Sequence, residues 1–204
     1  MNDAIKLSLS ADELELVCNK DWILAKKIVI DKVYFLMGEL SQKMQKHTMN
    51  NKSMLPTIVA ESSPKISRGE NYRGLPYVML DYPRYFKAND TLAIRTFFWW
   101  GNFFSINLHL SGAIKENALP ILKSNFNWLQ QNNYYLCIHS GPWEHHFEAD
   151  NYRLLKNYSA TEFEEIIHKK NFLKIGISIP LDQWQSVPAF MEHHFTELME
   201  LLKN

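Results

Sequence analysis

The chain has 204 residues, of which 46% are hydrophobic, and its 22 basic and 22 acidic residues give a formal net charge of zero. A chain of this length can bury a large apolar core without disulfides or structural metals. The neutral balance argues against a nucleic-acid partner, because such proteins usually carry a basic excess. Cys18 and Cys137 lie far apart and outside any CxxC pattern, which argues against a disulfide framework and a cysteine-rich zinc site.

The N-terminal residues show no basic stretch followed by an apolar run. No part of the chain approaches the roughly 18 uncharged apolar residues that a transmembrane helix needs. We therefore expect a cytoplasmic protein without a signal peptide and without a membrane partner.

The first 48 residues are predicted to be helical. Ser10 and Glu13 have the spacing of a capping box, which predicts a short helix ending near Cys18. Asp21 is expected to cap a long helix over residues 22–47, whose apolar side chains recur in steps of three and four. This helix either lies along a sheet or packs its far end on a second subunit, and its broad apolar stripe favours the first arrangement.

Residues 50–76 are rich in Asn, Ser, Gly and Pro and predict a loop with room for one short strand. A strand follows at 77–82. The prolines on both sides of it predict an edge strand or a bulge, because proline cannot donate to a β ladder. Two more strands, 91–100 and 103–110, are joined by Gly101 and Asn102, which predicts a tight two-residue hairpin.

The length of this turn decides which side chains share a face of the sheet. A two-residue loop pairs Trp100 with Phe103. It creates a mixed polar and aromatic face from Trp100, Phe98, Thr96, Ile94, Phe103, Ser105, Asn107 and His109. The opposite face would then be the main core, with Trp99, Phe97, Arg95, Ala93, Phe104, Ile106, Leu108 and Leu110. A three-residue loop would change these assignments.

The rest of the chain alternates helical and extended patterns. We expect a helix over 111–133, a strand at 134–139, a strand or extended loop at 144–149, a helix capped by Ser159 or Thr161, a strand at 172–179 and a helix over 186–204.

This order predicts an α+β fold, with a mainly antiparallel sheet of about five or six strands. Helices pack on one face, and the long N-terminal helix that precedes the sheet is a candidate for the other. We divide the chain into an N-terminal helical segment, 1–48, and an α+β domain, 49–204, and expect one compact domain overall.

Asp81 lies between Leu80 and Tyr82 in a predicted strand. A buried carboxylate needs a partner, and either Arg95 or Arg84 is placed to supply one.

The chain contains no phosphate-binding loop, metalloprotease helix or serine-hydrolase motif. Its densest set of chemistry-bearing side chains is His139 with Glu144, His146 and Glu148, near the strand that carries His109. Imidazole and carboxylate groups together bind Zn²⁺ or Mn²⁺, or act as acid and base near neutral pH. No defining ligand spacing supports a metal site, so we assign no metal and no cofactor. The same residues also suit half-buried strand histidines beside a solvated loop.

Two functions follow from this pattern. The first, which we favour, is a small-molecule-binding or enzymatic domain with its pocket on the mixed face of the sheet. Its residues would be Trp100 as an aromatic wall with Asn107, His109, His139, Glu144, His146 and Glu148. The second is a non-catalytic interaction protein that forms a homodimer through the long N-terminal helix. Convergence of His109, His139 and His146 in an open cleft would favour the first.

Overall fold

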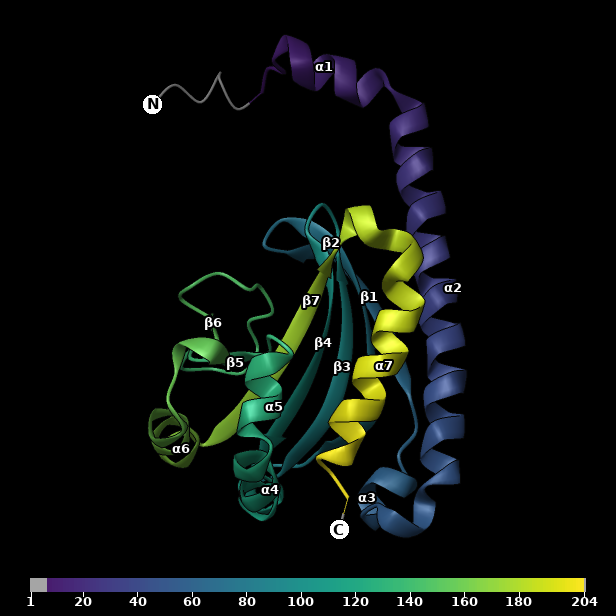
Figure 1. The fold of residues 1–204 in the computed structure, drawn as a ribbon. Coiled ribbons are helices and arrows are strands. Elements are labelled where there is room, and N and C mark those ends of the chain that lie inside the picture. The colour runs from purple at the N-terminus through teal and green to yellow at the C-terminus, as the bar shows by residue number, and fades with distance from the viewer. Residues whose placement is uncertain (1–6, 204) are drawn as a thin grey trace.

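The computed structural model describes residues 7–203, which form an α+β fold around a seven-stranded antiparallel sheet (Figure 1). The predicted fold class is confirmed. The strand order is β1-β2-β3-β4-β7-β5-β6. The strands are β1 (Lys65–Tyr72), β2 (Leu75–Phe86), β3 (Thr91–Trp99), β4 (Phe103–Ser111), β5 (Tyr135–Cys137), β6 (Tyr152–Leu154) and β7 (Phe172–Pro180).

Two helices begin the described chain, α1 (Ala11–Cys18) and α2 (Lys20–Asn50). The predicted capping box is present, with the Ser10 side chain accepting from the Glu13 amide and the Glu13 side chain accepting from the Ser10 amide. The expected cap of the long helix is wrong: Asn19 accepts from the Trp22 amide at 3.2 Å, and Asp21 already lies inside the helix. With 31 residues, α2 is about 46 Å long.

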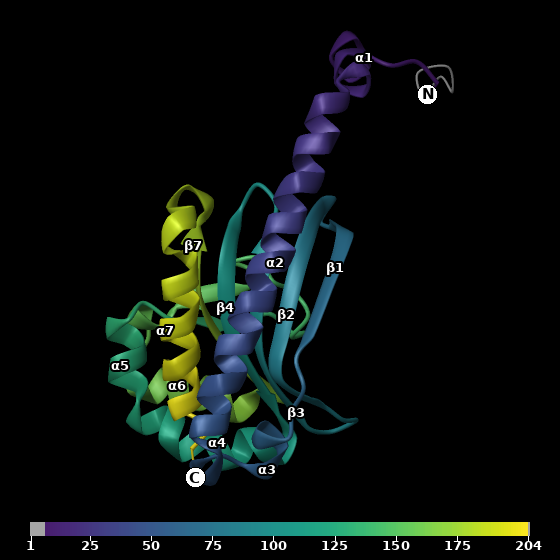
Figure 2. The same ribbon diagram turned by 90° about the vertical axis from the view of Figure 1, so that its right-hand side faces the viewer.

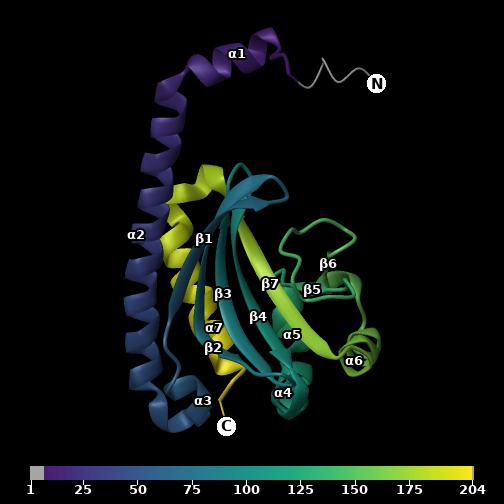
Figure 3. The same ribbon diagram turned by 180° about the vertical axis from the view of Figure 1, so that it is seen from behind.

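The helices that cover the sheet lie on one face of it (Figures 1 and 3). They are α2, α3 (Thr57–Ala60), α4 (Gly112–Ser124), α5 (Phe126–Gln131), α6 (Ala160–Lys169) and α7 (Val187–Glu200). The expectation that α2 covers the opposite face is wrong. Val33 and Met37 of α2 belong to the same buried cluster as Phe195 of α7 and Leu108 of β4. Figure 2 shows α2 and α7 side by side in front of the strands.

The hairpin between β3 and β4 has a three-residue loop, Trp100 to Asn102, because Trp99 pairs with Phe103. The predicted two-residue turn is therefore wrong. Each side chain of β3 therefore points to the face opposite to the predicted one. Arg95 and Phe97 share the face of Asn107. The side chains that face the helices are Phe98, Thr96, Ile94 and Leu92. Both faces of β3 are largely buried. A pattern of one apolar and one polar face, which normally fixes the register of a strand, is therefore missing from this part of the sequence.

The strand predicted at 77–82 is part of β2 and is not an edge strand. Part of the linker 50–76 forms β1, and β1 occupies the edge of the sheet. The alternative expectation, a bulge, is confirmed. The pairing of β2 with β3 shifts between Asp81 and Arg84, around Pro83, which cannot donate to the ladder.

One further expectation is corrected. The single helix expected over 111–133 is two helices, α4 and α5, which meet at Asn125.

Of the two alternatives for residues 144–149, a strand or an extended loop, the loop is the one observed. These residues belong to a loop, residues 138–151, that connects β5 to the short strand β6.

Leu108 is fully buried in the cluster between the sheet and the helices. We expect Leu108→Ala to lower the free energy of unfolding by about 2–5 kcal/mol, because the change removes buried apolar surface and leaves a cavity. Urea denaturation measures this. A loss below about 1 kcal/mol would contradict the packing described here.

Candidate functional site

The loop of residues 138–151 covers the face of the sheet that the helices leave free. The Tyr72 hydroxyl accepts from the backbone amides of His145 at 2.7 Å and His146 at 3.1 Å, and it donates to Glu144 Oε2 at 3.0 Å. Asn151, fully buried, donates from Nδ2 to the His146 carbonyl at 2.6 Å. These bonds fasten the middle and the end of the loop.

A chain of polar contacts runs beneath this loop. Arg95 pairs with Asp81 through two hydrogen bonds of 2.7 and 3.0 Å, which confirms one of the two partners expected for Asp81. Arg95 Nη1 lies 3.3 Å from His145 Nε2, and His145 Nδ1 lies 3.3 Å from Lys174 Nζ. The Lys174 Nζ also donates to the carbonyl oxygens of Pro142 at 3.0 Å and Glu144 at 2.6 Å.

These contacts bear on the protonation state of Lys174. A guanidinium only donates, so Nε2 of His145 is placed to accept from Arg95, which leaves the imidazole proton on Nδ1. Nδ1 lies 3.3 Å from Lys174 Nζ, and this contact favours the neutral amine over the ammonium. Burial lowers the pKa of Lys174 to about 7 and the pKa of His145 well below its usual range, so Lys174 loses its proton far more readily than an exposed lysine.

Asn107 belongs to a second buried set. Tyr152 Oη donates to Asn107 Oδ1 at 2.8 Å, and Asn107 Nδ2 donates to Ser105 Oγ at 3.1 Å. A side chain at Gly176, the residue paired with Asn107 across the sheet, would overlap the Asn107 amide. The Asn107 side chain is thus enclosed and serves to join β4 to β6.

His109 lies at the other side of the loop and lines a hollow of about 600 Å³ that opens to solvent. Its ring meets Trp143 and Phe172 edge-on at 5.7 and 5.9 Å. No hydrogen bond joins the His109 ring to another described residue. Burial, helped by Lys174 and Arg95, lowers the pKa of His109 to about 3, so its imidazole is neutral.

The remaining expected site residues occupy two places: His139 lies by itself, and Glu144, His146 and Glu148 lie together. The backbone amide of Gly141 donates to His139 Nδ1 at 3.1 Å, and this bond closes a local turn. His146 lies 3.6 Å from carboxylate oxygens of both Glu144 and Glu148. Burial, with Arg73 nearby, lowers the pKa of His146.

The expectation that Trp100 shares a face with Asn107 is wrong. Trp100 packs against the main core, with its ring edge-on to Phe98 at 6.4 Å. Asn107, His109, His139 and the group of Glu144, His146 and Glu148 therefore occupy different surroundings around the covering loop.

Sequence reasoning missed Lys174, His145 and Asp150. The available signal for Lys174 was a single lysine inside the otherwise apolar stretch FLKIGISI. A charged residue at such a position calls for a partner from elsewhere in the fold, and here that partner comes from the loop.

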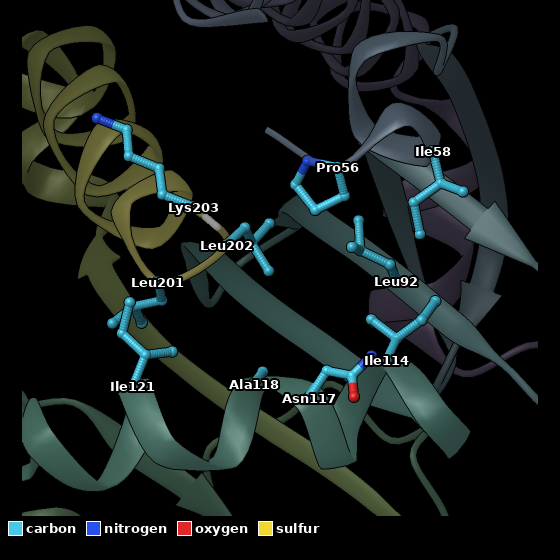
Figure 4. A pocket seen from close by; sticks show the side chains of 10 residues that line it. All are labelled: Pro56, Ile58, Leu92, Ile114, Asn117, Ala118, Ile121, Leu201, Leu202 and Lys203. Carbon is cyan, nitrogen blue, oxygen red and sulfur yellow. The ribbon is translucent and has the colours of Figure 1, made fainter. Parts of the chain in front are cut away.

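A smaller hollow of about 200 Å³ lies at one end of the sheet, between α3, α4 and the C-terminal residues (Figure 4). Leu92, Ile114 and Leu202 are among the side chains that line it. Its lining is mostly aliphatic, which suits packing rather than chemistry.

A different kind of surface occurs in residues 7–35, which we call the N-terminal arm. α1 and the first turns of α2 project beyond the sheet (Figures 1 and 2), and the first buried residue of the described chain is Ile30. Eleven of the fifteen large hydrophobic residues that the structure exposes lie in this arm: Leu7, Leu9, Leu14, Leu16, Val17, Trp22, Ile23, Leu24, Ile28, Tyr34 and Phe35.

No protein-family model, curated protein or solved structure matches the chain. Within residues 7–203, no helix combines the length and apolar character that crossing a bilayer requires.

The lowered pKa of Lys174 makes stability depend on pH. Unfolded lysine keeps a pKa near 10.5, whereas the folded value is about 7. Between these values the unfolded chain binds more protons, so the free energy of unfolding rises with pH, by up to about 1.4 kcal/mol per pH unit. Below the folded pKa both states are protonated and this contribution no longer changes.

Urea denaturation of the wild type and Lys174→Met from about pH 6 to about pH 9 measures this dependence. We expect the stability of the wild type relative to the variant to increase above neutrality. A constant difference across the range would mean that Lys174 keeps an ordinary pKa.

Proposed function

We propose that this protein is a self-associating interaction protein whose N-terminal arm forms a homodimer with a second copy of the chain. The observation that carries this proposal is the concentration of exposed apolar side chains in residues 7–35. Exposed apolar side chains concentrated in one segment are typical of an interaction site.

The arrangement on α2 supports a helix partner. Leu24, Ile28 and Phe35 are spaced by four and seven residues and form one stripe at 100° per residue. The stripe lies opposite the face on which Val33 and Met37 enter the core. An exposed stripe of this spacing suits packing against a helix of another chain.

The exposed area is large enough for a dimer. The eleven side chains are 43–90% exposed and lie around the arm. Together they offer roughly 1,000 Å² per chain, so a partner that covers most of them would reach the about 800 Å² that each chain contributes to a standard interface.

Charge supports a second copy as the partner. α1 is acidic, with Asp12, Glu13 and Glu15, whereas the first turns of α2 have a basic excess, with Lys20, Lys26 and Lys27 against Asp21. α1 turns away from α2 near Asn19 (Figure 1), so the two regions do not pair along their lengths within one chain. A two-fold axis would place the acidic helix of one copy beside the basic turns of the other, in a self-complementary contact.

The test uses the double variant Ile28→Glu and Phe35→Glu, whose side chains are 56% and 71% exposed. We expect the wild type to sediment as a dimer and the variant as a folded monomer, because two buried carboxylates per chain oppose apolar packing. Analytical ultracentrifugation gives the mass, and far-ultraviolet circular dichroism checks the fold.

Met49→Glu is the matched control, because Met49 is 74% exposed on the same helix outside the arm. It should remain dimeric. A monomeric wild type at tens of micromolar, or a variant that stays dimeric, would refute the proposal.

A second function, binding of a small anionic molecule, is favoured by the hollow beside His109. The neutral imidazole is free to donate or accept a hydrogen bond there, and Trp143 and Phe172 supply aromatic walls. Lys115, Lys170 and His168 line the same hollow against a single acidic residue, Glu116. Aromatic walls with a few polar groups are typical of ligand sites.

Succinate is a suitable probe, with binding measured by isothermal titration calorimetry. We expect saturable binding that His109→Ala abolishes at little cost in stability, while His193→Ala, at an exposed position of α7, leaves binding intact. Absence of succinate binding, or a stability loss at His109 as large as that at Leu108, would count against this function.

A further inference from the structure

We infer that His146, Glu148 and Asp150 form a binding site for a divalent first-row transition metal, such as Zn²⁺ or Mn²⁺. This site is independent of the proposed dimer, because it lies in the loop of residues 138–151 and not in the N-terminal arm. The inference rests on geometry, on an unpartnered buried nitrogen, on the support of the loop and on charge.

The three side chains present their donor atoms to one point. One ligand atom of each residue lies within 4.8 Å of the other two. His146 Nδ1 is 3.6 Å from Glu148 Oε2 and 3.7 Å from Asp150 Oδ1. These distances are too long for good hydrogen bonds. Adjacent ligands about 2.1 Å from a metal lie about 3.0–3.4 Å apart, so a small closure of the group completes the site.

The nitrogen at the centre of this group lacks a partner. The His146 side chain is only 1% exposed, and its Nδ1 is buried without a hydrogen bond to any residue in the range 7–203. A buried polar atom left unpaired costs free energy, so such an atom needs an explanation. A cation held between Nδ1 and the two carboxylates supplies the missing partner.

The surroundings hold the ligands in place. The amide of His146 is bonded to Tyr72, its carbonyl to Asn151, and the Glu148 carbonyl accepts from the amides of Asn151 and Tyr152 at 2.9 Å. The backbone between the ligands is therefore fastened at both ends.

Two further charged side chains, Glu144 and Arg73, lie next to the proposed ligands. Glu144 Oε2 lies 3.6 Å from His146 Nε2, the nitrogen that points away from Glu148 and Asp150. This carboxylate accepts from Tyr72 and is too far from Nε2 for a good hydrogen bond, but a closure of a few tenths of an ångström would let it orient a ligating histidine. Arg73 Nη1 donates to Glu148 Oε2 at 2.9 Å, so this oxygen, which also faces His146 Nδ1, is held in place by the guanidinium.

The charge of the group suits a dication. Glu144, Glu148 and Asp150 carry three negative charges, and Arg73 is the basic residue paired with them. One imidazole with two carboxylates suits Zn²⁺ or Mn²⁺, whereas Mg²⁺ and Ca²⁺ prefer oxygen alone. Three protein ligands also leave positions for water or another ligand.

Isothermal titration of the tag-free, chelator-treated full chain with Zn²⁺ tests the inference. We expect one site per chain, weakened at least tenfold in Glu148→Gln and in Asp150→Asn. Both positions are exposed, at 62% and 63%, so these variants keep the fold. His146→Ala should abolish the site, with circular dichroism as a check on folding.

Glu165→Gln on α6 is the matched control, because Glu165 is an equally exposed carboxylate, paired with Lys169 away from the loop. It should bind as the wild type does. Lack of saturable Zn²⁺ binding, or equal affinity in Glu148→Gln, Asp150→Asn and Glu165→Gln, would overturn the site. Tighter binding of Ca²⁺ than of Zn²⁺ would overturn the choice of a transition metal.

Discussion

The fold depends on how charges are satisfied on the face of the sheet that the helices leave uncovered. Arg95 and Lys174 project from neighbouring parts of that face and are nearly removed from solvent. Asp81 neutralises Arg95, but Lys174 has no carboxylate partner among its contacts and bonds to the carbonyls of Pro142 and Glu144 instead. A buried amine without these carbonyls would be costly. The position of the loop of residues 138–151 therefore follows from the need of Lys174 for acceptors.

Covering the face with a loop changes where chemistry can take place. The centre of the face is filled by side chains that satisfy one another, as Asn107 and Tyr152 do. Imidazole nitrogens without a hydrogen-bond partner among the described residues remain at the margins of the loop. They belong to His109, beside an open hollow, and to His146, among carboxylates. The N-terminal arm is remote from both, which separates self-association from any binding of small ligands or metal.

Much of the fold could be predicted because its signals are local. The capping boxes at Ser10 and Ser159 and the periodic apolar residues of α2 and α7 depend on neighbours within one or two turns. The hairpin register could not be predicted, because β3 is apolar on both faces and a one-residue change of loop length exchanges them. The candidate site was only partly predictable: Glu144, His146 and Glu148 were recognised, but Lys174 meets its contacts about 30 positions away, at His145 and at the carbonyls of Pro142 and Glu144.

The amino-acid sequence by itself determined the α+β class, the long N-terminal helix and the histidine- and carboxylate-rich stretch near residue 146, since periodicity, caps and composition act over short distances. The tertiary structure alone decided that all helices packed on the sheet share one face, that most apolar side chains of the arm stay exposed, and that a loop covers the other face. These outcomes depend on which distant surfaces meet. The free energy of such contacts comes from burial and hydrogen bonding between segments far apart in the chain, which no local pattern encodes.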